Sequence, residues 1–205
     1  MVRPERDPIG GEHAVEVDEC FIGGVHNKAI VVGAVEVRLR KDAEQRKAKF
    51  LDAHSGGIPL KKLIYAGRLR LRTVPHRSAP ELMLFINQNI AKGTTVRTDS
   101  NHSYQQVKGF YYEHERVNLS KEPDKAETHL PMIHLVFSNL KTWILGTHHG
   151  RIEPHHLQAY LNEYTYRFNR RFYPMTAFNS VLGLAAKSES PTYKELYSQE
   201  WVHPN

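Results

Sequence analysis

The segment that decides the fold is "AVEVDECFIGG", residues 14–24, in which apolar and polar side chains alternate before two glycines. Alternation with a period of two is typical of a strand with one face in the core, and the glycines end it. The apolar run "AIVVGAVEVRLRK", residues 29–41, follows at once and predicts a second strand. Because the intervening segment is short, we expect the two strands to form an antiparallel hairpin.

Three more strands and a helix are expected downstream of this hairpin. Arginine and leucine alternate in residues 68–76, and residues 94–100 and 110–119 are short runs that also read as strands. Residues 78–93 begin with a serine and an early proline, space their apolar residues as a helix does, and end at a glycine. This segment therefore predicts a helix.

Two longer helices follow, over residues 129–150 and 153–172. Between the second and third strands, residues 41–62 are basic and punctuated by glycine, which predicts a long and partly helical excursion. Residues 103–109 predict a brief helical turn. From residue 187 onward the chain is polar, which predicts a C-terminal tail or a small appended helix.

The expected order of elements is three strands, a helix, a strand, a helical turn, a strand and two helices. Three successive strands form an antiparallel meander, and the strand–helix–strand connection adds parallel pairing. The order predicts an α/β protein with a ribonuclease H-like mixed five-stranded sheet flanked by helices. We divide the chain into an N-terminal lead, residues 1–14, one domain, residues 15–186, and a tail, residues 187–205.

Composition narrows the class of protein. The chain has 205 residues, a formal net charge of +6 and a pI near 9.4, which favours a polyanionic partner. Its single cysteine, Cys20, excludes an internal disulfide framework and a multi-cysteine zinc ribbon within this sequence. No apolar run approaches the roughly 20 residues that span a bilayer, so we expect no membrane partner and a cytoplasmic location.

Two aspartates stand at strand positions where a carboxylate is unusual. Asp18 lies among apolar neighbours in the first strand, and Asp99 ends the fourth. In the expected topology these strands are adjacent, so the two carboxylates meet and form a site for Mg²⁺ or Mn²⁺. The alternative is structural: Asp18 pairs with an arginine and Asp99 starts a turn. Glu16, on the same strand face as Asp18, and Glu19 compete for its role.

Four segments in the same order resemble the DDE-type insertion-sequence transposases, in the ISXO2-like subgroup whose acidic triad is followed by a lysine. They are "VEVDECFIGG", "TTVRTDSNHSY", "HLVFSNLKTWILGTHHG" and "HLQAYLNEYTYRFNRR", and the similarity extends from about Val15 to Leu184. The resemblance implies a ribonuclease H-like core that binds two Mg²⁺ or Mn²⁺ ions. It assigns Asp18 and Asp99 as the first two metal ligands.

The resemblance also implies a function and partners. Such enzymes cleave a phosphodiester at the terminal inverted repeats of an insertion sequence and transfer the freed 3′ end to target DNA. The implied partners are double-stranded DNA, both the element ends and the target, and a second copy in a homodimer on DNA. The implied location is the bacterial nucleoid.

The third catalytic and metal-binding position is not acidic in this sequence. Counting seven residues back from Lys141 leads to His134, whereas Asn139 is the second choice. Residues seven apart differ by only about 20° around a helix, so His134 and Lys141 share a face, while Asn139 and Lys141 are about 160° apart. An imidazole nitrogen is also a better ligand than a carboxamide oxygen. We therefore favour His134, with Lys141 contacting DNA.

Two further groups have functional and structural interpretations. Arg167, Arg170 and Arg171, with aromatic residues between them, contact the DNA backbone or simply end a helix over the core. Two histidine pairs, His148-His149 and His155-His156, suggest a zinc site, but helix capping is the simpler explanation.

Two other functions compete with an active transposase. One is a catalytically inactive DNA-binding remnant, because the third ligand is not acidic and the N-terminal lead is short. The other is a cellular nuclease or resolvase on the same fold, which would share the metal site but lack end-specific joining.

Overall fold

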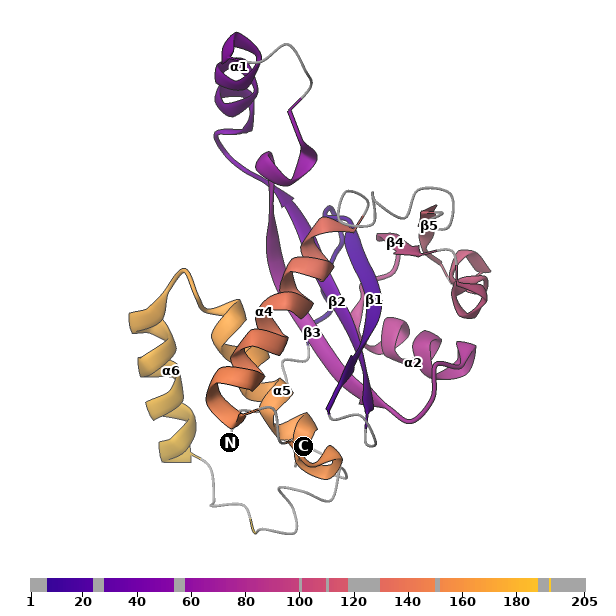
Figure 1. The fold of residues 1–205 in the computed structure, drawn as a ribbon, viewed down its shortest axis with the longest axis vertical. Helices are drawn as coiled ribbons and strands as arrows, with labels where there is room; N and C mark the ends of the chain where they lie inside the picture. Colours follow the sequence, from indigo (N-terminus) through magenta and orange to yellow (C-terminus); the bar gives the residue numbers. More distant parts are fainter. Residues whose placement is uncertain are drawn as a thin grey trace.

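A five-stranded mixed sheet forms the centre of the computed structural model, in the order β3-β2-β1-β4-β5 (Figure 1). Strands β1 (Val15–Ile22), β2 (Ala29–Leu39) and β3 (Ile64–Val74) form an antiparallel meander. Strand β4 (Thr95–Asp99) runs parallel to β1, and β5 (Glu113–Val117) runs parallel to β4. The structure describes residues 7–23, 28–53, 58–99, 101–109, 111–117, 130–149, 152–187 and 192.

This topology is that of the ribonuclease H-like fold and confirms the predicted fold class. The prediction that the first and fourth strands are neighbours is also confirmed, because Val15 pairs with Val96 and Glu16 with Arg97. The predicted C-terminal tail lies outside the described residues apart from Lys187 and Thr192.

Helices cover both faces of the sheet and enclose two apolar cores. Helix α2 (Ala79–Asn89) packs on one face, over Val15, Val17 and their neighbours. Helices α4 (Pro131–His148) and α5 (Pro154–Asn169) pack on the other, and α4 lies across the strands in Figure 1. None of the described helices combines the length and apolar character that crossing a membrane requires.

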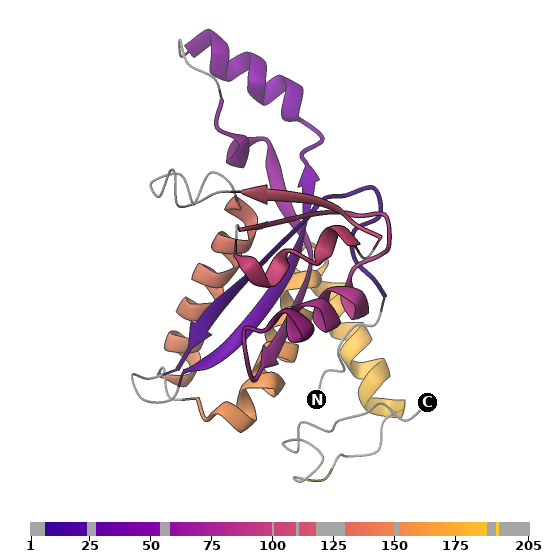
Figure 2. The ribbon, with the colours of Figure 1, turned by 90° about the vertical axis from the view of Figure 1, so that its right-hand side faces the viewer.

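The chain between β2 and β3 projects from the body of the protein as an arm (Figures 1 and 2). It carries helix α1 (Ala43–Ala53) and the 3-10 turn η1 (Leu60–Lys62), in the segment predicted as a partly helical excursion. We call residues 40–53 and 58–63 the β2–β3 arm. Two more 3-10 turns, η2 (His102–Tyr104) and η3 (Val107–Gly109), follow β4, where a brief helical turn is expected.

A last helix, α6 (Pro174–Lys187), departs from the sequence-based expectation. The sequence predicts one helix over 153–172 and none between it and the tail, but the structure ends α5 at Asn169 and starts α6 at Pro174. Proline fits the first turn of a helix because its missing N–H would have no partner there.

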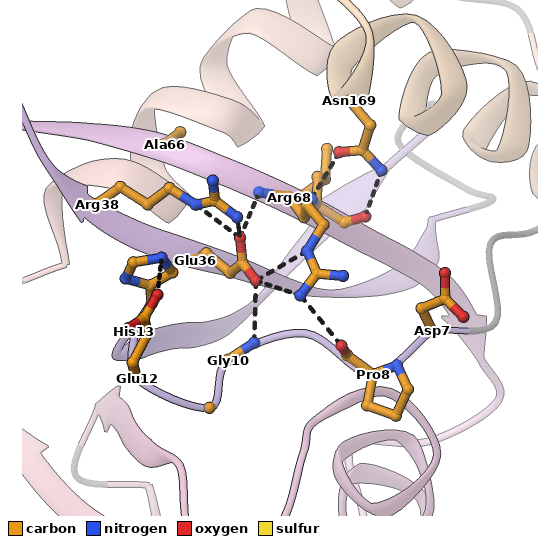
Figure 3. A network of polar contacts seen from close by, with 12 residues as sticks. Asp7, Pro8, Gly10, Glu12, His13, Glu36, Arg38, Ala66, Arg68 and Asn169 are labelled. Carbon is orange, nitrogen blue, oxygen red and sulfur yellow. Dashed lines mark hydrogen bonds and ion pairs between the residues drawn. The ribbon is translucent and has the colours of Figure 1, made fainter.

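Residues 7–10 are part of the packed structure. Ile9 is fully buried and pairs with Ile90, and the amide of Gly10 donates to Glu36 at 3.0 Å. Glu36, itself fully buried, also accepts from Arg68 and Arg38 (Figure 3). Burial alone would raise the pKa of Glu36, but these hydrogen bonds outweigh it and lower the pKa to about 2. The buried carboxylate ties β2, β3 and the start of the chain together.

Candidate active site

Alternation along β1 sends neighbouring carboxylates to opposite faces of the sheet. Asp18 faces α4, and its backbone neighbour across the sheet is Gly33 of β2. A Cβ atom at Gly33 would lie 2.8 Å from Phe137 Cε1 and 3.0 Å from Ile133 Cδ1. The missing side chain therefore lets α4 pack directly on the sheet beside Asp18. A lone glycine inside a strand is a recognised sequence signal of such close approach.

This close packing brings His134 to Asp18. The distance from His134 Nε2 to Asp18 Oδ2 is 3.2 Å, and both side chains are largely but not completely buried. With bonds near 2.1 Å, adjacent ligands of an octahedral ion lie about 3.0 Å apart. The pair thus has a spacing suited either to a direct hydrogen bond or to two neighbouring ligands of one ion.

Asp99 lies at the end of β4, close enough to Asp18 for the two carboxylates to repel one another. Burial and the charge of Asp18 raise the pKa of Asp99, while Arg77 and the amide of Asn101 oppose the rise. That amide donates to Asp99 Oδ1 at 3.0 Å, so Asp99 also starts a turn, as the structural alternative expects. Among the described residues, no three His, Cys, Asp or Glu side chains converge closely enough to hold one ion.

Glu16 has a structural contact that its position in the sequence does not reveal. Its Oε2 accepts from the amides of Met132 and Ile133, each at 2.8 Å. These amides open α4, where Leu130 offers no capping side chain. Burial raises the pKa of Glu16 to about 7 although both amides oppose the rise. Glu16 therefore fixes the start of the helix that carries His134.

Glu19 occupies the opposite face of β1, next to Arg77 at 3.3 Å. Burial raises its pKa, Arg77 opposes this, and the charges of Asp18 and Asp99 raise it further. The buried Tyr104 hydroxyl lies beside Glu19, and burial and the charge of Glu19 raise the pKa of this tyrosine. The repulsion that the Asp18 charge exerts on Asp99 is the feature that a bound divalent cation would relieve.

The two other candidates on α4 differ in position. Lys141 is exposed, and its charge reaches the Cys20 thiol of β1, opposing the burial that raises the pKa of Cys20 to about 12. Asn139 is exposed too, and no hydrogen bond of its side chain is seen among the described residues. Five positions apart on a helix correspond to about 140°, which separates Asn139 from the His134 face. The structure brings His134 to Asp18 and leaves Asn139 away from it.

Comparison with known proteins supplies the family. The profile of the ISXO2-like transposase domain matches residues 9–169. The chain belongs to this family. No sequence among the curated proteins matches it.

Solved structures with a similar arrangement come from two retroviruses. One is the simian T-cell lymphotropic virus intasome in complex with PP2A regulatory subunit B56 gamma, with 9% identity, a TM-score of 0.45 and coverage of 82% of this chain and 50% of that one. The other is the HTLV-2 integrase catalytic core domain in complex with magnesium (trimeric form), with 10% identity, a TM-score of 0.41 and coverage of 80% and 89%. This transposase domain thus spans about half the length of the first.

The three arginines predicted to contact DNA make contacts within the transposase domain. Arg167 pairs with Glu163 at 2.8 Å, and Arg170 lies 4.0 Å over the Tyr166 ring. Arg171 lies over Phe168 and Phe172 and donates to the Ala66 carbonyl of β3. From the strand register, Ala66 is roughly 17 Å from Asp18. These contacts favour the structural alternative, an end of α5 held over the core.

The histidine pairs of the transposase domain are part of aromatic packing. His148 lies between Trp143 and Tyr160, with ring centroids 5.4 and 4.1 Å away. His155 and His156 contact each other, with centroids 3.8 Å apart. Within the described ranges no zinc-type group of three ligands includes them.

Proposed function

We propose that this transposase domain cleaves DNA at the ends of an insertion sequence and joins the ends to target DNA, in a reaction that depends on divalent metal. The observation that carries the proposal is the contact of Asp18 with His134, beside Asp99, on a ribonuclease H-like sheet of a transposase family member. The three residues come from β1, β4 and α4, which are distant from one another in the sequence.

Asp18, Asp99 and His134 are the residues that would hold Mg²⁺ or Mn²⁺. A pair of such ions, when bound, supplies Lewis acidity to the attacking and leaving oxygens of phosphoryl transfer. Without an ion, a carboxylate facing the imidazole accepts a hydrogen bond, so His134 Nε2 carries the proton. A metal ligand needs an unprotonated nitrogen, so loading the site requires that this proton leave Nε2.

The surroundings orient these donors. Gly33 sets the separation of α4 from the sheet, and Glu16 fixes the first turn of α4 through two amides. With α4 held in this position, the side chain of His134 points toward Asp18. Positioning of this kind contributes to catalysis because reacting groups must be held close to their productive geometry.

The DNA-contacting surface we propose is Lys141 together with the β2–β3 arm. The arm carries seven Lys or Arg side chains against three carboxylates, and most of the cations are exposed: Arg40, Lys41, Arg46, Lys47, Lys49, Lys61 and Lys62. Cations that are exposed and close together bind phosphates by releasing condensed counterions. The arm therefore replaces the arginines at the end of α5 as the main candidate for backbone contacts.

A catalytically inactive DNA-binding remnant is the second candidate function. It is favoured by the non-acidic third ligand and by the absence, among the described residues, of three converging ligands. A cellular nuclease or resolvase would share the metal site but would not join ends to a target.

The decisive experiment is cleavage of a labelled terminal inverted repeat in Mg²⁺ and in Mn²⁺. We expect cleavage in both, faster in Mn²⁺ because imidazole is a softer ligand than carboxylate. His134→Ala should abolish it, whereas Asn139→Ala, five residues away on the same helix, should only weaken it. An active relative is the positive control. If the protein binds the DNA but cleaves it in neither metal, the transposase hypothesis is rejected and the inactive DNA-binding remnant remains. The reverse ranking of the two folded variants would reject His134 as the third ligand.

A further inference from the structure

The residues that follow Asp99 form a continuous series of hydrogen bonds. Asp99 Oδ1 accepts from the Asn101 amide at 3.0 Å, and Asn101 Oδ1 accepts from the Ser103 amide at 3.0 Å. The Ser103 hydroxyl then donates to the Arg77 carbonyl at 2.9 Å, in the connection between β3 and α2. We call these three hydrogen bonds the Asp99 brace. They join the carboxylate to a part of the chain that is distant in sequence.

The far end of the brace is attached to β1 and to the core. The Arg77 side chain pairs with Glu19, the residue after Asp18 on β1, at 3.3 Å. Tyr104, in the turn η2, is fully buried in the apolar core beneath α2. The brace is therefore fixed to the strand that carries Asp18.

The sheet alone does not hold Asp99 beside Asp18. Pairing between β4 and β1 ends at Arg97, before Asp99 is reached. Burial and the charge of Asp18 both raise the pKa of Asp99, whereas the Asn101 amide opposes the rise. A carboxylate at this position needs a fixed donor if it is to stay ionised and in place.

We propose that Asn101 and Ser103 are positioning residues, which hold the Asp99 carboxylate beside Asp18 in the place where it can bind a divalent ion. Neither side chain is a metal ligand in this role, because each fixes the next group in the series. Partners that orient a ligand change metal affinity although they do not touch the ion. The inference rests on the proposed function for the ion, but the hydrogen bonds need no ion and are tested without one.

Three serine variants separate this role from a general effect on folding. Ser103→Ala removes the hydroxyl that closes the brace, and Ser103→Thr keeps a hydroxyl at the same position. Ser180→Ala is the matched control, because the Ser180 hydroxyl donates to the Thr176 carbonyl at 2.8 Å on α6, which lies away from β4 in Figure 1. Both serines are partly exposed, so we expect all three variants to fold.

Amide hydrogen exchange, followed by NMR without metal or DNA, tests the brace itself. We expect slow exchange at the Asn101 amide in the wild type and in Ser103→Thr, because this amide donates to Asp99. Ser103→Ala should speed the exchange on the order of tenfold, the factor expected when one hydrogen bond is lost, and Ser180→Ala should leave it unchanged. Equal exchange rates in the wild type and in Ser103→Ala would overturn the proposal.

Titration with Mn²⁺, followed by the EPR signal of the free ion, tests the consequence for metal binding. We expect Ser103→Ala and Asn101→Ala each to raise the dissociation constant on the order of tenfold, Ser103→Thr to restore it and Ser180→Ala to leave it at the wild-type value. Unchanged affinity in Ser103→Ala, although Asn101 exchanges faster, would overturn the positioning role. A wild type that binds no Mn²⁺ would instead reject the metal site of the proposed function, and the exchange rates would then decide the brace.

Discussion

Replacing Glu36 by glutamine should destabilise the domain strongly at neutral pH and much less in acid. The carboxylate of Glu36 is fully buried and bonded to Gly10, Arg38 and Arg68, which lower its pKa from 4.5 to about 2. A folded-state pKa below the unfolded value means that the stabilisation is complete above about pH 4.5. It is lost as the pH falls toward 2.

The shift sets the size of the effect. A difference of 2.5 in pKa corresponds to about 3.4 kcal/mol at neutral pH. The side chains of Arg38 and Arg68 are 33% and 38% exposed, so solvent screens part of this energy. We therefore expect Glu36→Gln to lower the free energy of unfolding by about 2 to 3 kcal/mol at pH 7 and by about 1 kcal/mol at pH 3.

Urea denaturation of wild type and variant at both pH values tests this reasoning. Glu44→Gln is the matched control, because Glu44 is exposed on α1 and the same charge is removed. We expect the control to change stability little at either pH. If Glu36→Gln lowers the free energy of unfolding equally at pH 7 and pH 3, the electrostatic account is refuted and a packing defect is the remaining explanation.

Three further predictions concern the site and its surroundings. Gly33→Ala should cost about 1–3 kcal/mol in urea denaturation, because its Cβ would collide with Phe137, and should slow cleavage by displacing α4. Replacing Lys47, Lys49, Lys61 and Lys62 by glutamine should reduce the slope of log Kobs against log salt by about 3 to 4, whereas Arg167→Gln should barely change it. Arg171→Gln should lower stability by about 1–2 kcal/mol in the same denaturation assay and leave the salt slope unchanged, because its contacts are internal.

Most of the fold could be predicted from the periodic spacing of apolar residues. Alternation in "AVEVDECFIGG" gave β1, and the helical spacing of apolar residues in 129–150 gave α4. The same periodicity separated His134 from Asn139, since helix geometry alone decides which side chain can meet a strand below. The contact of His134 with Asp18 agrees with that reasoning.

Contacts between distant residues could not be predicted in this way. Glu16 caps α4, although the two are 116 residues apart in the sequence. No local pattern in β1 predicts that this carboxylate accepts from the amides of a helix so distant in sequence. Arg167 and Arg171 show a second difficulty. A cluster of arginines has the same sequence pattern whether its side chains contact DNA or other residues of the same protein. Helix α6 was not predicted, although Pro174 at its start and the helical spacing of Met175, Phe178 and Leu182 are helix signals in the sequence.

Histidine at position 134 suits a site that already contains an excess of negative charge. Burial and the charge of Asp18 raise the pKa of Glu19 and of Asp99, and a glutamate 3.2 Å from Asp18 would add a fourth carboxylate to this group. An imidazole instead donates to Asp18 and satisfies it before any cation arrives. Replacing a carboxylate by an imidazole thus lowers the affinity of the site for a hard ion. The same replacement stabilises the site when no ion is bound, so we expect the protein to be folded in metal-free solution.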